Sequence, residues 1–300
     1  MKIIIIAGGS GFLGQVLENY FSSKGYSVKI LTRNPKRENE LYWNAEDLGE
    51  WTKSLENAYA LINLTGKSVD CRYTDGNKKL IFDSRIDSTH ALGLAINLCE
   101  NPPKVWFNSS TATIYASSLE FQNDEENGII GNDFSMNIAK SWEEAFYSIK
   151  NPTTRKIALR TAIVLGKKGG AMIPLKRLTK LGLGGKQASG KQKISWIHEQ
   201  DFARAIDFLM NDQNLEGNFN LSVPNPTNNK TFMATLRRIL NIPFGISHPK
   251  WLLEFGAKLI GTETELVLKS RNVVPKRLHQ NGFSFKFDDL NLALNDLIKN

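Results

Sequence analysis

The sequence predicts an α/β protein built on a doubly wound parallel sheet, with a smaller, mainly helical C-terminal lobe. Three observations lead to this fold class. An apolar run occupies 3–7, a glycine-rich loop follows it directly, and strand-like and helix-like segments then alternate through the first half of the chain. A strand, a glycine loop and a helix in this order are typical of a Rossmann domain, which binds a dinucleotide.

The alternation in the first half is regular enough to place each element. The predicted strands are 2–7, 27–32, 59–64, 105–109 and 156–165, and the predicted helices are 14–24, 81–98 and 134–149. Strands that alternate with helices favour a parallel sheet covered on both faces.

The pattern loosens beyond Gly166. Strands are predicted at 194–198 and 218–223, and helices at 201–210, 232–240 and 251–259. We therefore predict a Rossmann domain made of 1–170 and 201–224, and a substrate or capping lobe made of 171–200 and 225–300. This lobe is expected above the carboxyl edge of the sheet, where open α/β sheets bind their ligands.

The composition is that of an ordinary soluble globular protein, with 41% hydrophobic and 23% charged residues. The longest aliphatic run, at 3–7, is too short to cross a bilayer, and it leads into the glycine loop without the layout of a signal peptide. Cys71 and Cys99 provide neither a disulfide framework nor a zinc cluster. We therefore expect a cytoplasmic protein with no membrane partner and no metal site.

Much of the net charge of +8 comes from one basic stretch that contains no acidic residue. Its members are Lys167, Lys168, Lys176, Arg177, Lys180, Lys186, Lys191 and Lys193. They form either a solvated loop and helix face, or a rim that attracts an anionic substrate. Nucleic acid is not expected, because aromatic residues do not interleave with these lysines. The sequence indicates no particular oligomeric state.

The glycine loop, Gly8–Gly14, has the spacing Gly-x-x-Gly-x-x-Gly. Gly8 permits a tight turn, Gly11 lets the backbone approach a pyrophosphate, and Gly14 lets helix and strand pack closely. The helix that follows presents free amides and a partial positive charge to the phosphates.

The end of the second predicted strand indicates which dinucleotide binds. An acidic residue there would favour NAD by accepting hydrogen bonds from the ribose hydroxyls. The chain instead has Thr32-Arg33-Asn34, followed by Lys36 and Arg37. Because a guanidinium suits a bidentate contact with a 2′-phosphate, Arg33 favours NADP(H) as the cofactor.

Several motifs resemble a known superfamily. Gly8–Gly14, Asn63-Leu64-Thr65-Gly66 and the segment 109–115 are similar to the extended short-chain dehydrogenase/reductases, which include the NAD-dependent epimerases and dehydratases. Segments 84–89, 195–198, 220–226 and 274–278 resemble, more narrowly, the atypical "epimerase family" group, which has a short C-terminal domain of its own. The resemblance covers nearly the whole chain.

The resemblance implies roles for further residues. Leu64, Thr65 and Gly66 would line the adenosine and ribose side of the cofactor, and Arg85 and Gly166 would lie near the nicotinamide. Lys140 would bind the nicotinamide ribose, and Thr111 would hold the reacting oxygen. With the glycine loop, the expected cofactor-binding residues are Gly8, Ser10, Gly11, Phe12, Leu13, Gly14, Arg33, Leu64, Thr65, Gly66, Arg85, Lys140 and Gly166.

The chain departs from the superfamily at its proton-transfer motif, Tyr-x-x-x-Lys. The matching segment is Met136-Asn137-Ile138-Ala139-Lys140, so the lysine is present and the tyrosine is not. A thioether has no proton to give and cannot act as a general acid or base. We therefore expect another donor and favour Tyr115, which follows Thr111 at the end of a strand; Tyr73 and Arg85 also border the expected cleft.

These observations predict an NADP(H)-dependent oxidoreductase or epimerase-like enzyme that acts on a small, anionic or sugar-nucleotide substrate. The expected catalytic residues are Thr111, Tyr115 and Lys140. The alternative is a non-catalytic NADP(H)-binding regulatory protein, which the missing tyrosine favours.

Overall fold

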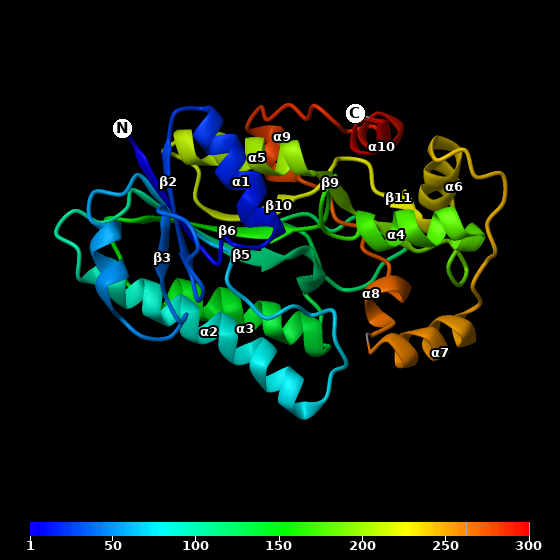
Figure 1. Ribbon diagram of the computed structural model, residues 1–300, viewed down its shortest axis with the longest axis horizontal. Coiled ribbons are helices and arrows are strands. Elements are labelled where there is room, and N and C mark those ends of the chain that lie inside the picture. The colour runs from blue at the N-terminus through cyan, green and yellow to red at the C-terminus, as the bar shows by residue number, and fades with distance from the viewer. Residues whose placement is uncertain (262, 300) are drawn as a thin grey trace.

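The structure, a computed structural model, describes residues 1–261 and 263–299 and is built around one large sheet (Figure 1). Its strands lie in the order β10-β6-β5-β4-β1-β2-β3, and all neighbours are parallel. They are β1 (Ile3–Ala7), β2 (Ser27–Thr32), β3 (Glu40–Tyr42), β4 (Ala60–Asn63), β5 (Val105–Thr111), β6 (Arg155–Thr161) and β10 (Gly217–Leu221). The predicted fold class is confirmed. Strand order reverses between β1 and β4, the switch point at which such sheets bind ligands.

Helices cover both faces of this sheet. On one face lie α1 (Phe12–Ser23) and α5 (Glu199–Asn211), and on the other α2 (Asp75–Asn97) and α3 (Phe134–Ser148) (Figure 1). The side chains of β1 serve both layers, because Ile4 and Ile6 enter one core and Ile5 and Ala7 the other. Successive side chains of a strand point to opposite faces, so burial on both faces requires an uninterrupted apolar run.

The second half forms smaller elements, most of which lie beyond the carboxyl ends of β5 and β6, whereas α9 (Lys276–Gln280) lies beside α5 and packs against β10 (Figure 1). The strands are β7 (Ile163–Leu165), β8 (Lys193–Ile194), β9 (Trp196–His198) and β11 (Thr227–Asn228). The helices are α4 (Met172–Leu178), α6 (Asn229–Ile239), α7 (Lys250–Ile260), α8 (Glu265–Leu268), α9 (Lys276–Gln280) and α10 (Leu290–Lys299). Elsewhere in the chain, short helical segments are η1 (Glu50–Leu55), η2 (Ala112–Ile114) and η3 (Thr179–Leu183). Within the described ranges, the structure contains no helix with the length and apolarity needed to cross a bilayer.

Two predicted strands are corrected by the structure, because each is divided in two. The strand predicted at 156–165 is β6 followed by β7, since the chain leaves the large sheet after Thr161 and pairs with β9. The strand predicted at 194–198 is β8 followed by β9, separated by Ser195. The Ser195 hydroxyl donates to the carbonyls of Arg271 and Val273 (2.8 and 3.0 Å), which turns the chain between two small sheets.

The predicted division into a Rossmann domain and a lobe remains a proposal, and the packing adds one detail to it. Leu278 and Phe283, from the segment assigned to the lobe, are buried in the same core as α1 and α5. By contrast, Phe287 and Leu294 join a separate core with Phe232 of α6. The last quarter of the chain therefore contacts the large sheet before it returns to the lobe.

His198 links the two parts at the start of α5. Its Nδ1 accepts a hydrogen bond from the Gln200 amide at 3.1 Å, so it caps the helix. The ring is fully buried and stacks on Phe287 at 3.9 Å between centroids. Burial lowers its pKa, although Asp296, 3.3 Å from Nε2, acts in the opposite direction. The folded protein therefore favours neutral His198.

We predict that this histidine makes the protein less stable in mild acid. A pKa that is lower in the folded than in the unfolded chain gives stability above the unfolded pKa that is lost as the pH falls toward the folded one. Thermal unfolding at about pH 7 and about pH 5 should show a larger fall in Tm for the wild type than for His198→Asn, which keeps a capping side chain but does not titrate. Equal falls would refute this assignment.

Candidate cofactor and active site

The glycine loop joins β1 to α1 by close backbone contacts. Gly8 has a φ of 71°, and a Cβ there would lie 3.0 Å from the backbone of Thr65. A Cβ on Gly14 would lie 2.1 Å from the Gly9 carbonyl oxygen, so no side chain fits between helix and loop. A Cβ on Gly11 would meet nothing within 4 Å, and no side chain caps the α1 N-terminus. The loop thus has a crowded side that needs glycine and an open side where amides can meet a ligand.

A cavity of about 650 Å³ opens on that side of the loop. Predicted cofactor residues that line it are Gly8, Ser10, Gly11, Arg33, Leu64, Thr65 and Gly66, and Trp43, Asn44 and Ala45 complete its far wall. The Thr65 hydroxyl is buried and has no hydrogen-bond partner among the described residues. A buried orphan hydroxyl, glycine backbone and an aromatic wall fit the ribose, phosphate and adenine of a dinucleotide.

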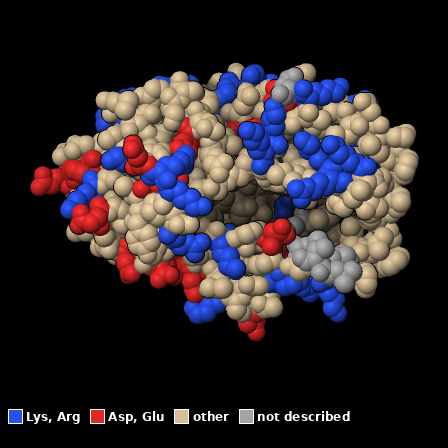
Figure 2. Space-filling view, in the orientation of Figure 1, with Lys and Arg blue, Asp and Glu red and all other residues tan. Residues whose placement is uncertain are grey.

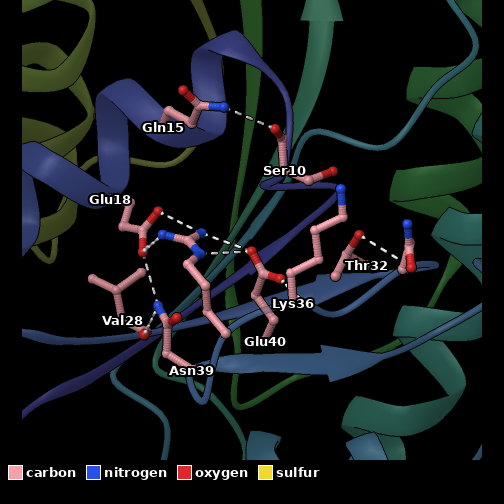
Figure 3. Close-up of polar contacts among 10 residues, drawn as sticks. Ser10, Gln15, Glu18, Val28, Thr32, Lys36, Asn39 and Glu40 are labelled. Atoms are coloured by element: carbon pink, nitrogen blue, oxygen red, sulfur yellow. Dashed lines mark hydrogen bonds and ion pairs between the residues drawn. The ribbon is translucent and has the colours of Figure 1, made fainter.

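Three basic residues, Arg33, Lys36 and Arg37, follow β2, and the structure separates their roles. Figure 3 shows the ion pairs that hold one of these arginines between Glu18 and Glu40. Arg37 is held by two carboxylates, at 2.8 Å from Glu18 Oε1 and 2.8 Å from Glu40 Oε1. Arg33 is exposed, lines the cavity and makes no ion pair among the described residues.

Lys36, like Arg33 and unlike Arg37, makes no ion pair with the described residues. Its backbone amide donates to Glu40, whereas its side chain extends toward Ser10 and the glycine loop (Figure 3). Lys36, Ser10, Thr32 and Asn34 line a second cavity of about 590 Å³ beside the first. The sequence pointed to Arg33, but it could not show that the Lys36 ammonium is free of ion pairs with the described residues, whereas the Arg37 guanidinium is held by Glu18 and Glu40.

Arg85 lies behind the cavity wall and connects α2 to the loop after β4. Its Nη1 donates to the carbonyls of Lys67 and Ile81 at 3.1 and 2.8 Å, and its guanidinium lies over the Trp142 ring at 4.9 Å. A Cβ on Gly66 would lie 3.1 Å from Arg85 Cζ, so Gly66 leaves room for it. Burial lowers the Arg85 pKa to about 10. In the residues described, no carboxylate pairs with this cation.

Phe12 and Gly166, both predicted to bind the cofactor, contact each other. A Cβ on Gly166 would lie 2.1 Å from Phe12 Cζ, and one on Gly169 would lie 2.2 Å from Phe12 Cδ2. The Phe12 ring is therefore enclosed by glycines after β7, and Leu13 packs on the main core. The side chains of Phe12 and Leu13 therefore help to position the glycine loop.

The residues of the proton-transfer motif lie on α3, which packs against η2 at the end of β5. The Thr111 hydroxyl donates to Thr113 Oγ1 at 3.0 Å and accepts from the Thr113 amide. Lys140 Nζ donates to Asn132 Oδ1 at 2.6 Å. Met136 is buried, and a Cβ on Gly131 would lie 2.0 Å from its sulfur, so the thioether fills space against that loop.

Tyr115 lies in a buried network behind these residues. Its hydroxyl accepts from Arg160 Nη1 at 2.7 Å and donates to Asn220 Oδ1 at 3.0 Å. Glu143 pairs with Arg160 at 2.7 Å and accepts from Ser110 at 2.6 Å. Burial raises the Tyr115 pKa. Because its hydroxyl already accepts one hydrogen bond and donates the other, this geometry argues against Tyr115 as the proton donor.

The carboxyl edge of the sheet opens into a hollow near the middle of the face shown in Figure 2. Lys and Arg side chains lie on its borders, including the region over α4, and blue atoms are visible inside it. From the basic stretch, Lys167 and Lys168 line a further cavity of about 580 Å³ with Phe12 and Glu199.

Comparison with known proteins agrees with this geometry. Residues 4–136 match the model of the NAD dependent epimerase/dehydratase family, and residues 248–297 match a domain of unknown function, DUF1731. An epimerase family protein from Staphylococcus epidermidis is 34% identical over 304 residues, covering 100% of both chains. A second from Staphylococcus aureus strain N315 is 34% identical over 303 residues, again covering 100% of both. The chain belongs to the epimerase family.

Two solved structures resemble this one over nearly their whole length. Human epimerase family protein SDR39U1, crystallised with NADPH, is 28% identical, has a TM-score of 0.90, and is matched over 99% of both chains. UDP-N-acetylglucosamine 4-epimerase from Bacillus cereus is 17% identical with a TM-score of 0.77, covering 99% of this chain and 95% of its own, and shows the fold alone.

We predict that Tyr115→Phe destabilises this epimerase family protein by about 1–3 kcal/mol, because buried Arg160 and Asn220 would each lose a partner. Urea denaturation measures the loss. Tyr147→Phe is the matched control: its hydroxyl also contacts an asparagine (Asn218, 2.7 Å), but the side chain is 40% exposed, so water replaces the bond. A Tyr115→Phe protein no less stable than Tyr147→Phe would show that the network contributes little.

Proposed function

We propose that this epimerase family protein is a cytoplasmic NADP(H)-dependent oxidoreductase or epimerase-like enzyme acting on a small anionic or sugar-nucleotide molecule. The observation that carries the choice of NADP(H) is the position of two cations, Arg33 and Lys36, after β2 beside the glycine-loop cavity, where neither makes an ion pair with the residues that the structure describes. No acidic residue stands at the end of β2 to bind the ribose hydroxyls. The presence of NADPH in the human relative supports the same choice.

In this proposal each part of the chain has a distinct task. Gly8, Gly11 and Thr65 hold the pyrophosphate and ribose, and Arg33 and Lys36 hold the 2′-phosphate. The bound nicotinamide supplies or accepts a hydride. Lys140 orients the nicotinamide ribose. For this, its ammonium either gives up its hydrogen bond to Asn132 Oδ1 or donates to the ribose as well.

The remaining task is to bind the reacting oxygen. We assign it to Thr111, whose hydroxyl can turn from Thr113 to the substrate because it lies at the end of β5 with only a local bond to release. The protein's contribution is position and electrostatics, and the cofactor carries the difficult chemistry.

We predict that Arg33→Ala weakens NADPH binding about 10- to 100-fold, the effect of losing a charge-assisted contact, and changes NADH binding much less. Fluorescence titration with both nucleotides measures this ratio. Arg177→Ala in α4 removes one exposed charge elsewhere and should leave the ratio unchanged. Equal weakening of both nucleotides by Arg33→Ala would show that the 2′-phosphate is not recognised there.

The second candidate function is a non-catalytic NADP(H)-binding regulatory protein, which the buried thioether of Met136 favours. A screen of carbonyl compounds and sugar nucleotides that follows NADPH absorbance, with product analysis to detect epimerisation, separates the two functions. The enzyme proposal predicts turnover by the wild type and loss of at least about 100-fold in Lys140→Met, the scale of a lost catalytic interaction. NADPH binding without turnover of any compound would support the regulatory function.

A further inference from the structure

Tyr73, in the loop between β4 and α2, has a hydroxyl with no role in the fold. The hydroxyl is buried, and in the described part of the chain it has no hydrogen-bond partner. A buried hydroxyl without a partner costs about 1–3 kcal/mol, so such groups often mark a bond that a ligand completes. Tyr115, the other tyrosine near the site, already makes both of its bonds.

The Tyr73 ring contacts the N-terminal end of α3, the helix that carries Met136 where the superfamily has its catalytic tyrosine. It packs against Phe134, the first residue of α3, with 4.8 Å between ring centroids. Ser135 lowers the Tyr73 pKa, so its hydroxyl lies close to the phenol, although the two groups do not meet the geometry of a hydrogen bond. Met136 is the next residue. Tyr73 therefore brings a phenol from a different loop to the first turn of α3, the turn that also contains Met136.

Two segments far apart in sequence hold Tyr73 in place. Its backbone amide donates to Glu263 Oε1 at 2.9 Å, and the Arg72 guanidinium lies 3.4 Å from Glu263 Oε2. Immediately after it, Thr74 caps α2 by accepting from the Asn77 amide at 3.3 Å. Tyr73 thus lies where the C-terminal lobe meets the Rossmann domain, which is where this fold binds substrate.

Charged groups surround the Tyr73 phenol from several elements. Arg85 of α2 and Arg271 of the lobe both interact with it electrostatically, and Arg271 has a buried Nη1 without a hydrogen-bond partner among the described residues. The acidic groups and thiol that face it are Glu265, Glu263 and Cys71.

The acidic groups are largely engaged elsewhere. Glu263 pairs with Arg72, and Glu265 lies 2.8 Å from Lys269 and 3.6 Å from Arg271 Nη2. Burial raises the Tyr73 pKa and is the largest effect; Ser135 acts in the opposite direction, and each of the negative groups raises the pKa by a smaller amount. The phenol is therefore protonated at neutral pH, as a proton donor must be, and the electrostatic interaction with Arg85 and Arg271 favours the phenolate left after transfer.

Resting on the NADP(H) function proposed above, we propose that Tyr73 is the proton donor of the reaction, in place of the tyrosine that Met136 replaces. In a reduction, NADPH gives a hydride to the carbonyl carbon and is oxidised to NADP⁺. The C=O double bond becomes a single bond, and the oxygen takes the proton of the Tyr73 hydroxyl. The phenolate then regains a proton from water.

The test uses the whole protein labelled with 3-fluorotyrosine, whose phenol titrates at lower pH than tyrosine. Each of the seven tyrosines gives a ¹⁹F resonance, and the one lost in Tyr73→Phe belongs to Tyr73. If Tyr73 lies at the reacting end, the positive ring of NADP⁺ stabilises its phenolate, so its titration midpoint should be lower by about 1 pH unit with NADP⁺ than with NADPH. Tyr42, which is 64% exposed on β3, should not shift.

The outcomes separate this inference from the proposed function. Binding of both nucleotides with the same Tyr73 midpoint overturns the role of Tyr73 and leaves NADP(H) binding intact. Failure of both nucleotides to bind, seen in the fluorescence titration, overturns the proposed function itself. For a carbonyl compound found in the screen, Tyr73→Phe should lower the single-turnover rate at least about 100-fold with an unchanged Kd for NADPH. A rate equal to that of the wild type would also overturn the inference.

Discussion

The backbone crowding at the glycine loop is the constraint on which the rest of the site depends. Gly9 and Gly14 approach so closely that α1 can begin only where no Cβ intervenes, and Gly8 meets Thr65 in the same way. These contacts set the distance between α1, β1 and the loop after β4, and hence the width of the cavity between them. The glycines after β7 extend the constraint, since they leave room for Phe12. A larger residue at Gly8 or Gly14 would push apart the backbone segments that border the glycine-loop cavity and so change its shape.

On the face of the sheet covered by α2 and α3, a buried ion pair fixes the position of a helix, as the glycine loop does for α1 on the other face. Glu143 and Arg160 tie α3 to β6, and Ser110 and Tyr115 extend the network to the end of β5. A buried pair of this kind contributes little net stability but strongly disfavours other arrangements, because removing either partner leaves an isolated charge. Its consequence is positional, since it orients the helix that carries Met136 and Lys140. The C-terminal lobe adds the remaining boundary through Glu263, Glu265 and Arg271.

Much of this could be predicted from the sequence, because the signals are local. The apolar run of β1, the glycine spacing and the alternation of strands and helices determined the fold class, since each depends only on neighbouring residues and on the period of a strand or helix. Arg33 was found for the same reason, by its place after β2. The absence of a tyrosine at Met136 was likewise evident from the sequence alone.

Only the tertiary structure decided which side chains are available. Lys36 and Arg37 are both basic residues after β2, yet the side chains of Glu18 and Glu40 form ion pairs with Arg37 and not with Lys36. Tyr115 follows a strand end as a catalytic residue would, but Arg160 and Asn220, far along the chain, enclose its hydroxyl. Tyr73 gains its position from Phe134 and Glu263, which are distant from it in sequence. The sequence determines which elements form, whereas the availability of a charge or a hydroxyl depends on contacts between elements, which no local pattern encodes.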